Sequence, residues 1–254
     1  MDIFHAALLG IVEGLTEFLP ISSTGHLILA SDLLGLPETE FLKSFEVVIQ
    51  LGAILAVVTL YWRKLLFDRP MMQRIIIALF PALGVGYLFY ASIRKLLDSE
   101  TTVVVALFIG GIILILFERF RKVPEQPTPL EGISYRQALL IGFTQALSVI
   151  PGVSRAGATI VGGLFTGLSR KAAVEFSFLL GVPTMVAATT LDLYKNYATF
   201  SFDNVQALAT GLIVSFVVAL VAIKFLLRYV QSHTFIAFGI YRIIAAVLFA
   251  LIVL

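Results

Sequence analysis

The sequence predicts an all-α protein whose helices cross a membrane several times. Hydrophobic residues make up 59% of the 254 residues and charged residues only 13%, whereas a soluble domain carries about 25% charged residues. The apolar residues recur in blocks of about 20, the length of helix that crosses a hydrocarbon core of ~30 Å. A soluble helical bundle would need a polar face on each helix, and the segment 102–116 has none.

Six segments are apolar and long enough to be predicted as transmembrane helices. They cover residues 41–62, 72–91, 102–118, 173–191, 205–227 and 235–254. Two further apolar regions, 3–36 and 136–168, are interrupted by Pro, Gly and polar residues, so neither half of either region is long enough to span. Each is predicted to be a re-entrant helical hairpin, which enters the membrane and turns back.

The two halves of the chain are predicted to form an inverted-topology repeat. Each half has a broken hairpin followed by three spans, and the proline-containing polar linker 119–135 separates the halves. Four stretches match in the same order: 13–16 with 145–148, Pro20 with Pro151 when a one-residue gap is allowed, 22–25 with 154–157, and 46–52 with 175–181. The prediction is a single membrane domain, 1–254, with repeat one at about 1–118 and repeat two at about 136–254. Three crossings per half, an odd number, make the halves inverted.

Lys and Arg residues gather on one side of this predicted topology, which marks that side as cytoplasmic. They are Arg63, Lys64, Arg69, Arg74, Arg119, Arg121, Lys122, Arg136, Arg170, Lys171, Lys224 and Arg228. The opposite side keeps Lys43, Arg94, Lys95 and Lys195. The first hairpin then enters from outside and the second from the cytoplasm. Their tips are predicted to meet near the midplane, as in inverted-repeat transporters.

Composition also excludes some classes of function. A net charge of +2 is too small to indicate nucleic-acid binding. The chain has no Cys, which excludes disulfides and thiol chemistry. The first basic residue is Lys43, so the N-terminus lacks the basic region of a cleavable signal peptide.

Glu13 and Glu17 interrupt the first apolar region and, being four residues apart, share one helix face. Two carboxylates repel each other, and a low dielectric makes each charge costly. Protonation of one acid, a divalent cation or a nearby guanidinium would offset this repulsion. A water-filled interfacial pocket is the simpler alternative, but intramembrane acids are functional by default.

Both hairpin tips are predicted to present helix N-termini. Pro20 ends the first half-helix, and the Ser and Thr residues at 22–24 cap the next one. In the second hairpin the Pro-Gly pair 151–152 turns the chain, Ser154 caps, and Arg155 adds a full charge. Helix N-termini bind anions, most often phosphate. For the Ser and Thr residues alone, the alternative is simple helix capping. For Arg155 alone, the alternative is a salt bridge to a buried Glu.

Other polar residues support weaker predictions. His26 lies three residues after Ser23, so one helical turn would place its ring near that hydroxyl, and a Ser–His pair is a minimal activated nucleophile. A buried His is, however, more often a satisfied core residue. Glu46 and Glu175 are interpreted as supports for the hairpins, bonding their backbone turns. Arg242 is interpreted as a partner of a buried acid or as a snorkelling side chain.

Residues 13–20 (EGLTEFLP) and 22–26 (SSTGH) resemble the first signature of the undecaprenyl-diphosphatases of the bacitracin-resistance type. Residues 151–155 (PGVSR) with 157–159 (GAT) resemble the second signature. The resemblance extends to 45–52 and 241–242 and covers essentially the whole chain. One departure is Ala156, where the family often has Ser.

The resemblance implies a hydrolase that removes the terminal phosphate of undecaprenyl diphosphate. The product is the monophosphate carrier lipid for peptidoglycan synthesis, and turnover of this lipid explains the link to bacitracin. The resemblance also implies an active site on the outer side of the bacterial cytoplasmic membrane and a divalent cation, Mg²⁺ or Ca²⁺. The expected partners are the polyprenyl diphosphate, membrane lipids and a second copy in a homodimer, with no nucleic acid.

The resemblance also implies roles for individual residues. Ser23 is the nucleophile or its assistant, Glu17 a catalytic acid or base or a metal ligand, and His26 an activator. Arg155 is a phosphate clamp, and Glu13 matches the first acidic position of the motif and is the second expected metal ligand. The expected substrate-binding residues are Arg155, Ser22, Thr24, Ser154, Gly157 and Thr159.

Two mechanisms and two other classes of function stay open at this point. Either Ser23 attacks and forms a phosphoserine, or activated water attacks while Ser23 only binds. A polyprenyl-phosphate flippase or anion transporter would use the same midplane site, but a carrier needs no nucleophile. A purely structural membrane protein would leave several ionisable residues unexplained, each costing about 2.5–3.5 kcal/mol at hydrocarbon depth.

Overall fold

The computed structural model describes residues 1–89, 96, 99–122, 124–196 and 204–253, without the side chains of 191–193, 195, 196 and 253. Arg94, Lys95 and the side chain of Lys195, expected on the outer side, lie outside the described residues. Within the described part the chain is helical, with no strand beyond an isolated bridge between Thr128 and Leu168. The prediction of an all-α protein is confirmed.

The helices follow the predicted segments to within a few residues. The first broken region forms α1 (Ile3–Thr16) and α2 (Ser23–Leu33). The second forms α7 (Tyr135–Ala146), η2 (Leu147–Val149) and α8 (Arg155–Phe165). The six predicted spans are α3 (Glu40–Phe67), α4 (Arg69–Leu88), α6 (Glu100–Phe120), α9 (Arg170–Asn196), α10 (Val205–Tyr229) and α11 (Ile236–Val253). In both hairpins the two half-helices pack against each other.

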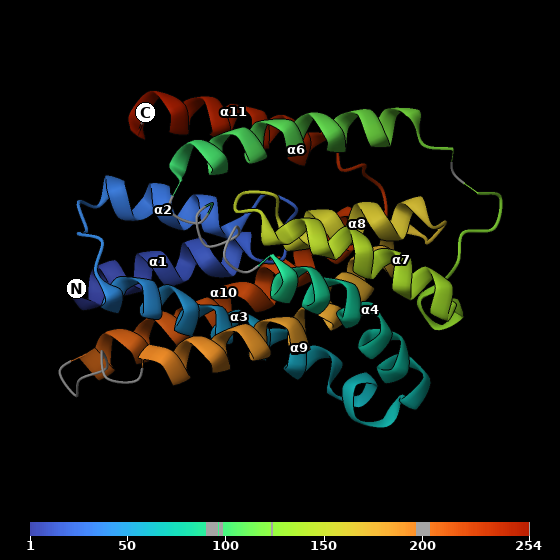
Figure 1. Ribbon diagram of the computed structural model, residues 1–254, viewed down its shortest axis with the longest axis horizontal. Coiled ribbons are helices and arrows are strands. Elements are labelled where there is room, and N and C mark those ends of the chain that lie inside the picture. Colours follow the sequence, from blue (N-terminus) through green and yellow to red (C-terminus); the bar gives the residue numbers. More distant parts are fainter. Residues whose placement is uncertain (90–95, 97–98, 123, 197–203, 254) are drawn as a thin grey trace.

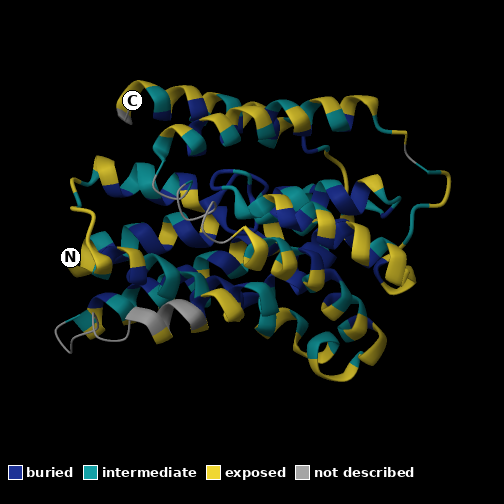
Figure 2. Cartoon of the chain, in the orientation of Figure 1, coloured by how far each residue is buried: buried dark blue, intermediate teal, exposed yellow. Residues whose placement is uncertain are grey.

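The outer surface of the bundle is apolar, as lipid requires. Five helices, α3, α4, α6, α9 and α10, are long and apolar enough to cross a membrane, and among the described residues α1 and α11 are shorter apolar helices. Exposed residues on the helices include Phe108, Ile109, Ile113, Ile213, Val217 and Val221. Figure 2 shows exposed residues on the outer faces of the helices and buried ones toward the centre. Soluble proteins rarely expose such continuous apolar surface, so the chain is a multi-pass membrane protein.

The hairpins divide the length of the molecule between them. Figure 1 shows both chain termini at one end and the α3–α4 turn and the α6–α7 linker at the other. The α1–α2 hairpin fills the half near the termini, and the α7–α8 hairpin fills the opposite half. Their tips therefore meet near the middle of the bundle.

Helices of the two halves pack in reciprocal pairs. α1 lies along α10, its counterpart α7 lies along α4, and α6 pairs with α11. Where α6 and α11 cross, a Cβ on Gly111 would come within 2.7 Å of the Gly239 carbonyl oxygen, and one on Gly239 within 2.8 Å of that of Gly111. Two structurally equivalent halves would give such pairs, although the bounds of the repeats stay a prediction.

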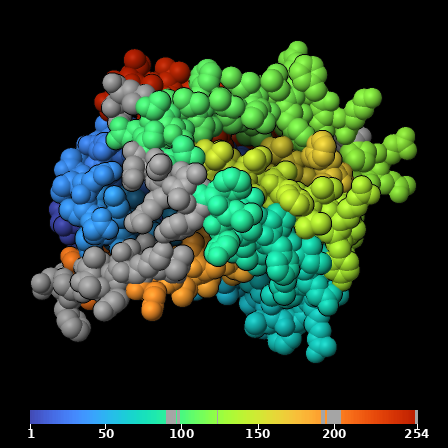
Figure 3. Space-filling view, in the orientation of Figure 1, coloured from blue at the N-terminus to red at the C-terminus, as the bar shows by residue number. Residues whose placement is uncertain are grey.

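Small residues permit the close approach of these helices. A Cβ on Gly10 of α1 would lie 2.7 Å from the Gly211 carbonyl oxygen of α10, and one on Gly142 of α7 would collide with the Ala78 carbonyl oxygen of α4. Helices in lipid associate through such backbone-close packing rather than through a hydrophobic driving force. Figure 3 shows the resulting surface, with side chains of α4 and α7 adjoining those of α6.

Two ion pairs lie among the loops and helix ends on the side of the α6–α7 linker. Glu118 of α6 accepts hydrogen bonds from Arg170 Nε and Nη2, at 3.1 and 2.9 Å, and from the backbone N–H of Phe235 at 3.3 Å. Lys64 Nζ lies 2.6 Å from Glu131 Oε1 in the linker. The hydrogen bond from the Lys64 ammonium lowers the pKa of Glu131 below its ordinary value.

Replacing Glu118 with alanine is expected to lower the free energy of unfolding by about 2–3 kcal/mol, because it leaves the Arg170 guanidinium and the Phe235 N–H without their acceptor. The Glu118 side chain is 1% exposed. Glu131→Ala is the matched control, since its side chain is 69% exposed and exposed pairs contribute about 0–1 kcal/mol. Thermal unfolding in detergent measures both variants, and equal shifts in Tm would contradict the prediction.

Candidate active site

Both hairpin tips turn at serine residues with an unusual backbone conformation. Ser22, before α2, has a φ of 73°, and Ser154, before α8, has a φ of 75°. A residue other than glycine is strained at such a positive φ. This strain persists only where the surrounding structure holds the backbone in place, which often occurs at functional sites. The two serines match in the predicted repeat, so one strained turn recurs in both tips. We call residues 17–24 the first tip and residues 147–155 the second tip.

A polar cavity of about 210 Å³ lies between the two tips. Glu17 and 22–24 line it from the first tip, and Ser148, 150–152 and 154–155 line it from the second. By a similar measure a water molecule needs about 10–15 Å³, so the cavity has room for a group with several oxygen atoms. Ser22, Thr24, Ser154 and Arg155, all expected to bind substrate, are brought together here.

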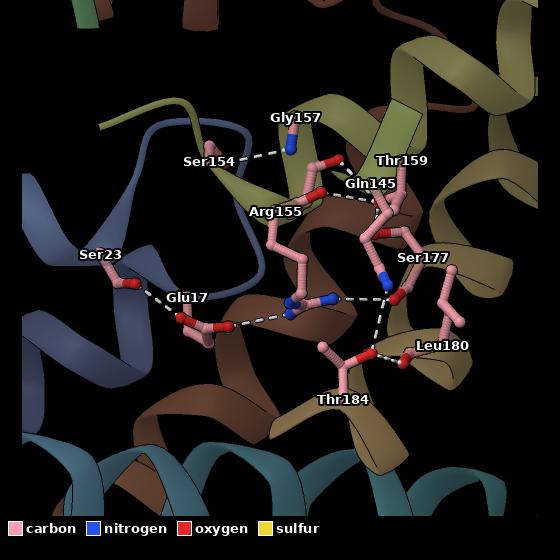
Figure 4. A network of polar contacts seen from close by, with 11 residues as sticks. Glu17, Ser23, Gln145, Ser154, Arg155, Gly157, Thr159, Ser177, Leu180 and Thr184 are labelled. Carbon is pink, nitrogen blue, oxygen red and sulfur yellow. Dashed lines mark hydrogen bonds and ion pairs between the residues drawn. The ribbon is translucent and has the colours of Figure 1, made fainter. Parts of the chain in front are cut away.

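Arg155 and Glu17 connect the two tips (Figure 4). Arg155 Nη2 donates to Glu17 Oε1 at 2.9 Å, and Arg155 Nη1 donates to the Ser177 carbonyl oxygen of α9 at 3.0 Å. A Cβ on Gly181 of α9 would collide with the guanidinium, so the missing side chain makes its room. The Arg155 guanidinium is therefore one group that offsets the charge repulsion between the paired acids Glu13 and Glu17.

Ser23 is hydrogen-bonded to the other oxygen of the same carboxylate. Its hydroxyl donates to Glu17 Oε2 at 2.6 Å, and both side chains are buried. A general base must lie within about 2.6–3.2 Å of the group it deprotonates. Glu17 is thus placed to activate Ser23, and Arg155 holds the carboxylate on the opposite side.

His26 does not lie at the Ser23 hydroxyl, contrary to the expected Ser–His pair. Its Nδ1 lies 2.7 Å from the Ser22 carbonyl oxygen and its Nε2 lies 2.7 Å from the Tyr241 hydroxyl. A carbonyl can only accept, so Nδ1 carries the proton of the neutral ring and Tyr241 donates to Nε2. Both ring nitrogens have partners, and the place beside Ser23 is taken by Glu17. A catalytic role of His26 stays a prediction.

Two residues expected to bind substrate do not line the cavity. The backbone N–H of Gly157 donates to Ser154 Oγ at 3.0 Å. Through this hydrogen bond the Ser154 side chain caps the N-terminus of α8. Thr159 is buried, and its hydroxyl lies 2.6 Å from the Ser177 hydroxyl oxygen. Gly157 and Thr159 therefore support the second tip from behind, because their hydrogen-bonding groups are used within the protein.

Glu13 lies one helical turn before Glu17, outside the cavity lining. Its side chain is 0% exposed, and neither carboxylate oxygen has a hydrogen-bond partner within the described structure. Among the described residues no three or more His, Asp or Glu side chains form a group that could hold a metal. Magnesium, however, is often bound by one or two carboxylates together with substrate phosphates. The expected cation at Glu13 and Glu17, which the substrate would help to hold, stays a prediction.

Some contacts differ from the sequence-based interpretation. Gln50 of α3 and Met185 of α9 line the cavity, and neither was predicted to do so. The sequence signal that could have identified Gln50 is its polar side chain within an apolar span. Glu46 accepts a hydrogen bond from Ser31 Oγ of α2 at 3.2 Å. Its partner is therefore a side chain of the first hairpin and not, as expected, the backbone of the hairpin turn. Glu175 accepts from the Tyr61 hydroxyl of α3 at 3.1 Å and does not support a hairpin.

Arg242 also differs from its interpretation, because among the described residues it neither pairs with an acid nor snorkels. It is 2% exposed, and its hydrogen bonds within the described structure all go to backbone carbonyl oxygens. Its length and full set of five donors let it reach several chain segments at once.

Comparison with known proteins agrees with the signatures in the sequence. A family model described as "Bacitracin resistance protein BacA" matches residues 6–248. A protein from Wolinella succinogenes named undecaprenyl-diphosphatase is 50% identical over 250 residues, which are 98% of this chain and 97% of the relative. Proteins of the same name from Sulfurihydrogenibium sp. and Aquifex aeolicus are 51% and 47% identical, and cover 99% and 98% of this chain and 99% and 98% of their own lengths. The match extends over nearly the whole chain, and this chain belongs to the bacitracin resistance protein BacA family.

Proposed function

We propose that this chain is an undecaprenyl-diphosphatase, which hydrolyses the terminal phosphate of the C55 lipid diphosphate and regenerates the monophosphate carrier lipid. One observation carries the proposal: Ser23, Glu17 and Arg155 form a continuous chain of hydrogen bonds in a polar cavity between two helix N-termini. Relatives that bear the name undecaprenyl-diphosphatase, and are about half identical over their full length, support it.

The diphosphate group binds between the tips. The Arg155 guanidinium offers phosphate oxygens a fork of parallel N–H groups. Ser22 forms no side-chain cap hydrogen bond at the start of α2, which leaves backbone N–H groups there for an anion. The hydroxyl groups of Thr24 and Ser154 add donors beside them.

Ser23 is the nucleophile in the reaction that this geometry supports best. Its Oγ attacks the terminal phosphorus, and the bond from that phosphorus to the bridging oxygen breaks. Glu17 takes the hydroxyl proton and passes it to the departing lipid monophosphate. Water then attacks the phosphoserine while Glu17 accepts a water proton and returns it to Ser23 Oγ, which releases inorganic phosphate. In the alternative mechanism Glu17 activates water directly and Ser23 only binds the phosphate.

Glu13 and Glu17 are the residues that would hold a divalent cation, Mg²⁺ or Ca²⁺, together with phosphate oxygens. Such an ion would supply positive charge against the transferring phosphoryl group. The two carboxylate oxygens of Glu13, buried one helical turn before Glu17 and without a hydrogen-bond partner in the described structure, support this assignment. Before substrate binds, Arg155 holds Glu17 in position.

The lipid tail needs an apolar path to the cavity. An apolar pocket of about 120 Å³ lies beside the second tip, with Ile113, Leu147 and Val161 in its lining, and we assign the first isoprene units to it. The basic residues near the α3–α4 turn and in the linker support an orientation in which that end lies in the cytoplasm of a bacterial cell. The end with both termini then faces the outer side of the cytoplasmic membrane, from which the first tip is reached.

Phosphate release by the purified protein in detergent tests this function. We expect release from the C55 diphosphate with Mg²⁺ or Ca²⁺, loss of release with a chelator, and recovery when the cation is restored. Glu13→Gln is expected to raise the cation concentration needed for half-maximal rate by at least about 10-fold. Detergent removes the second compartment, so a flippase or anion carrier would release no phosphate and that outcome would refute the enzyme. Release that is insensitive to chelator would refute only the cation.

A further inference from the structure

Arg242, in the middle of α11, is a buried cation with no acidic partner in the part of the chain that the structure describes. It is 2% exposed, and none of the ion pairs among the described residues includes it. Its donors reach five carbonyl oxygens, those of Leu107 (3.3 Å), Pro20 (3.2 Å), Val153 (2.9 Å), Ala106 (3.0 Å) and Gly152 (2.9 Å). Burying an unpaired charge is costly even when it is hydrogen-bonded, so this arrangement calls for an explanation beyond packing.

The carbonyl groups that Arg242 binds belong to both tips. Pro20 lies two residues before Ser22 in the first tip, and Gly152 and Val153 directly precede Ser154 in the second. The bonded carbonyl groups therefore lie one or two residues before the two serines that have a positive φ. One guanidinium therefore joins the backbones of two strained turns that lie far apart in the sequence.

Neighbouring groups on α11 and α6 complete this connection. The hydroxyl of Tyr241 bonds His26, whose other nitrogen donates to the Ser22 carbonyl oxygen. Consecutive residues of α11 thus hold the first tip on either side of its turn. On α6, a Cβ at Gly110 would collide with the Arg242 guanidinium, so the absence of a side chain there makes room for it.

We infer that Arg242 is a positioning residue that sets how the two tips meet, and so brings Ser23 and Glu17 of the first tip to Arg155 of the second. Arg242 does not line the polar cavity between the tips. It lines the apolar pocket assigned to the lipid tail, but its five donors bond backbone carbonyl oxygens, so it acts on the reacting groups through the backbone that it binds. The kinetic part of this inference rests on the proposed phosphatase function, whereas the ordering of the tips does not.

Arg242→Lys tests the inference, because lysine keeps the charge but has three donors and no planar fork. We expect kcat to fall about 10–100-fold, since small misplacements of reacting groups have effects of this size. KM should change less than kcat, because Arg155 and the tip hydroxyls still bind the diphosphate, while Arg242 only borders the pocket assigned to the first isoprene units. Amide hydrogen exchange should rise in the peptides that cover 17–26 and 147–157 and stay unchanged in α10.

Arg170→Lys is the matched control, because it also replaces a hydrogen-bonded arginine but disrupts the pair with Glu118, away from the tips. It is expected to lower Tm while kcat and tip exchange stay at wild-type values. Wild-type kcat and wild-type tip exchange in Arg242→Lys would overturn the inference. Exchange that rises evenly over all helices would also overturn it, because this would be a general loss of stability.

A second variant covers the case in which Arg242→Lys does not fold. Gly110→Ala keeps Arg242 and places a methyl group against its guanidinium, and it should raise tip exchange and lower kcat in the same direction. Gly86→Ala is its control, since a Cβ there meets nothing within 4 Å. Identical behaviour of these two variants would overturn the inference. If the wild-type protein releases no phosphate, the proposed function fails, and the exchange data still decide whether Arg242 orders the tips.

Discussion

Replacing Ser23 with alanine is expected to lower kcat for phosphate release by about 10³-fold or more, with a much smaller change in KM. The variant removes the only hydroxyl that donates to Glu17 among the described residues, and with it the group placed to attack phosphorus. Phosphate release from the C55 diphosphate in detergent measures the effect. Ser148→Ala is the matched control, because that serine also lines the cavity but its hydroxyl bonds the Gln145 carbonyl oxygen. We expect this control to change kcat less than about 10-fold.

The same variant separates the two mechanisms. Wild-type protein quenched during turnover should carry a phosphoserine at Ser23, detectable by mass spectrometry of the peptide that contains it. A large loss of activity in Ser23→Ala with no phosphoserine in the wild type would support direct attack by water. Near-full activity of Ser23→Ala would refute both a nucleophilic and an essential binding role.

Glu17→Gln is expected to lower kcat by about 10²–10⁴-fold, the usual contribution of a positioned general base. The amide keeps the shape of the side chain but cannot take the Ser23 proton, and it loses the charge that pairs with Arg155 at 2.9 Å.

Glu46→Gln is the control for this prediction, since Glu46 is another acid within a span but does not line the cavity. Its carboxylate accepts a hydrogen bond from Ser31, which a carboxamide oxygen also accepts. The control should keep kcat within about threefold of the wild type. A Glu17→Gln variant as active as Glu46→Gln would exclude Glu17 as the base.

The paired roles of Glu17 and Arg155 have a consequence for substrate binding. In the described structure each serves as a partner of the other, so a bound diphosphate competes with Glu17 for the guanidinium. A diphosphate carries more charge than a single carboxylate and offers several oxygens to the same fork. Binding of substrate would therefore loosen the hold of Arg155 on Glu17 at the step in which Glu17 must accept a proton.

Features that depend on local sequence were predictable. The bounds of α3, α6 and α10 follow from the lengths of apolar segments, and the hairpin tips follow from Pro20 and the Pro-Gly pair at 151–152. Glu17, Ser23 and Arg155 were identifiable as site residues because charged and polar groups are costly within apolar segments. These properties depend on near neighbours in the chain and on the free energy of transfer into lipid, which the sequence determines by itself.

The partners of these residues depend on tertiary packing. Whether Glu17 or His26 bonds Ser23 is decided by the positive φ at Ser22 and by the Tyr241 hydroxyl, 215 residues from His26 in the chain. Arg242 was expected to bond an acid, and it instead binds carbonyl oxygens as far as 222 residues away. A hydrogen bond forms only where packing brings donor and acceptor within about 3 Å. Sequence alone therefore indicated Glu17, Ser23 and Arg155 as candidate site residues and the helices that carry them. Only the meeting of two distant tips against α11 decided which residues line the cavity and which atoms bond to which.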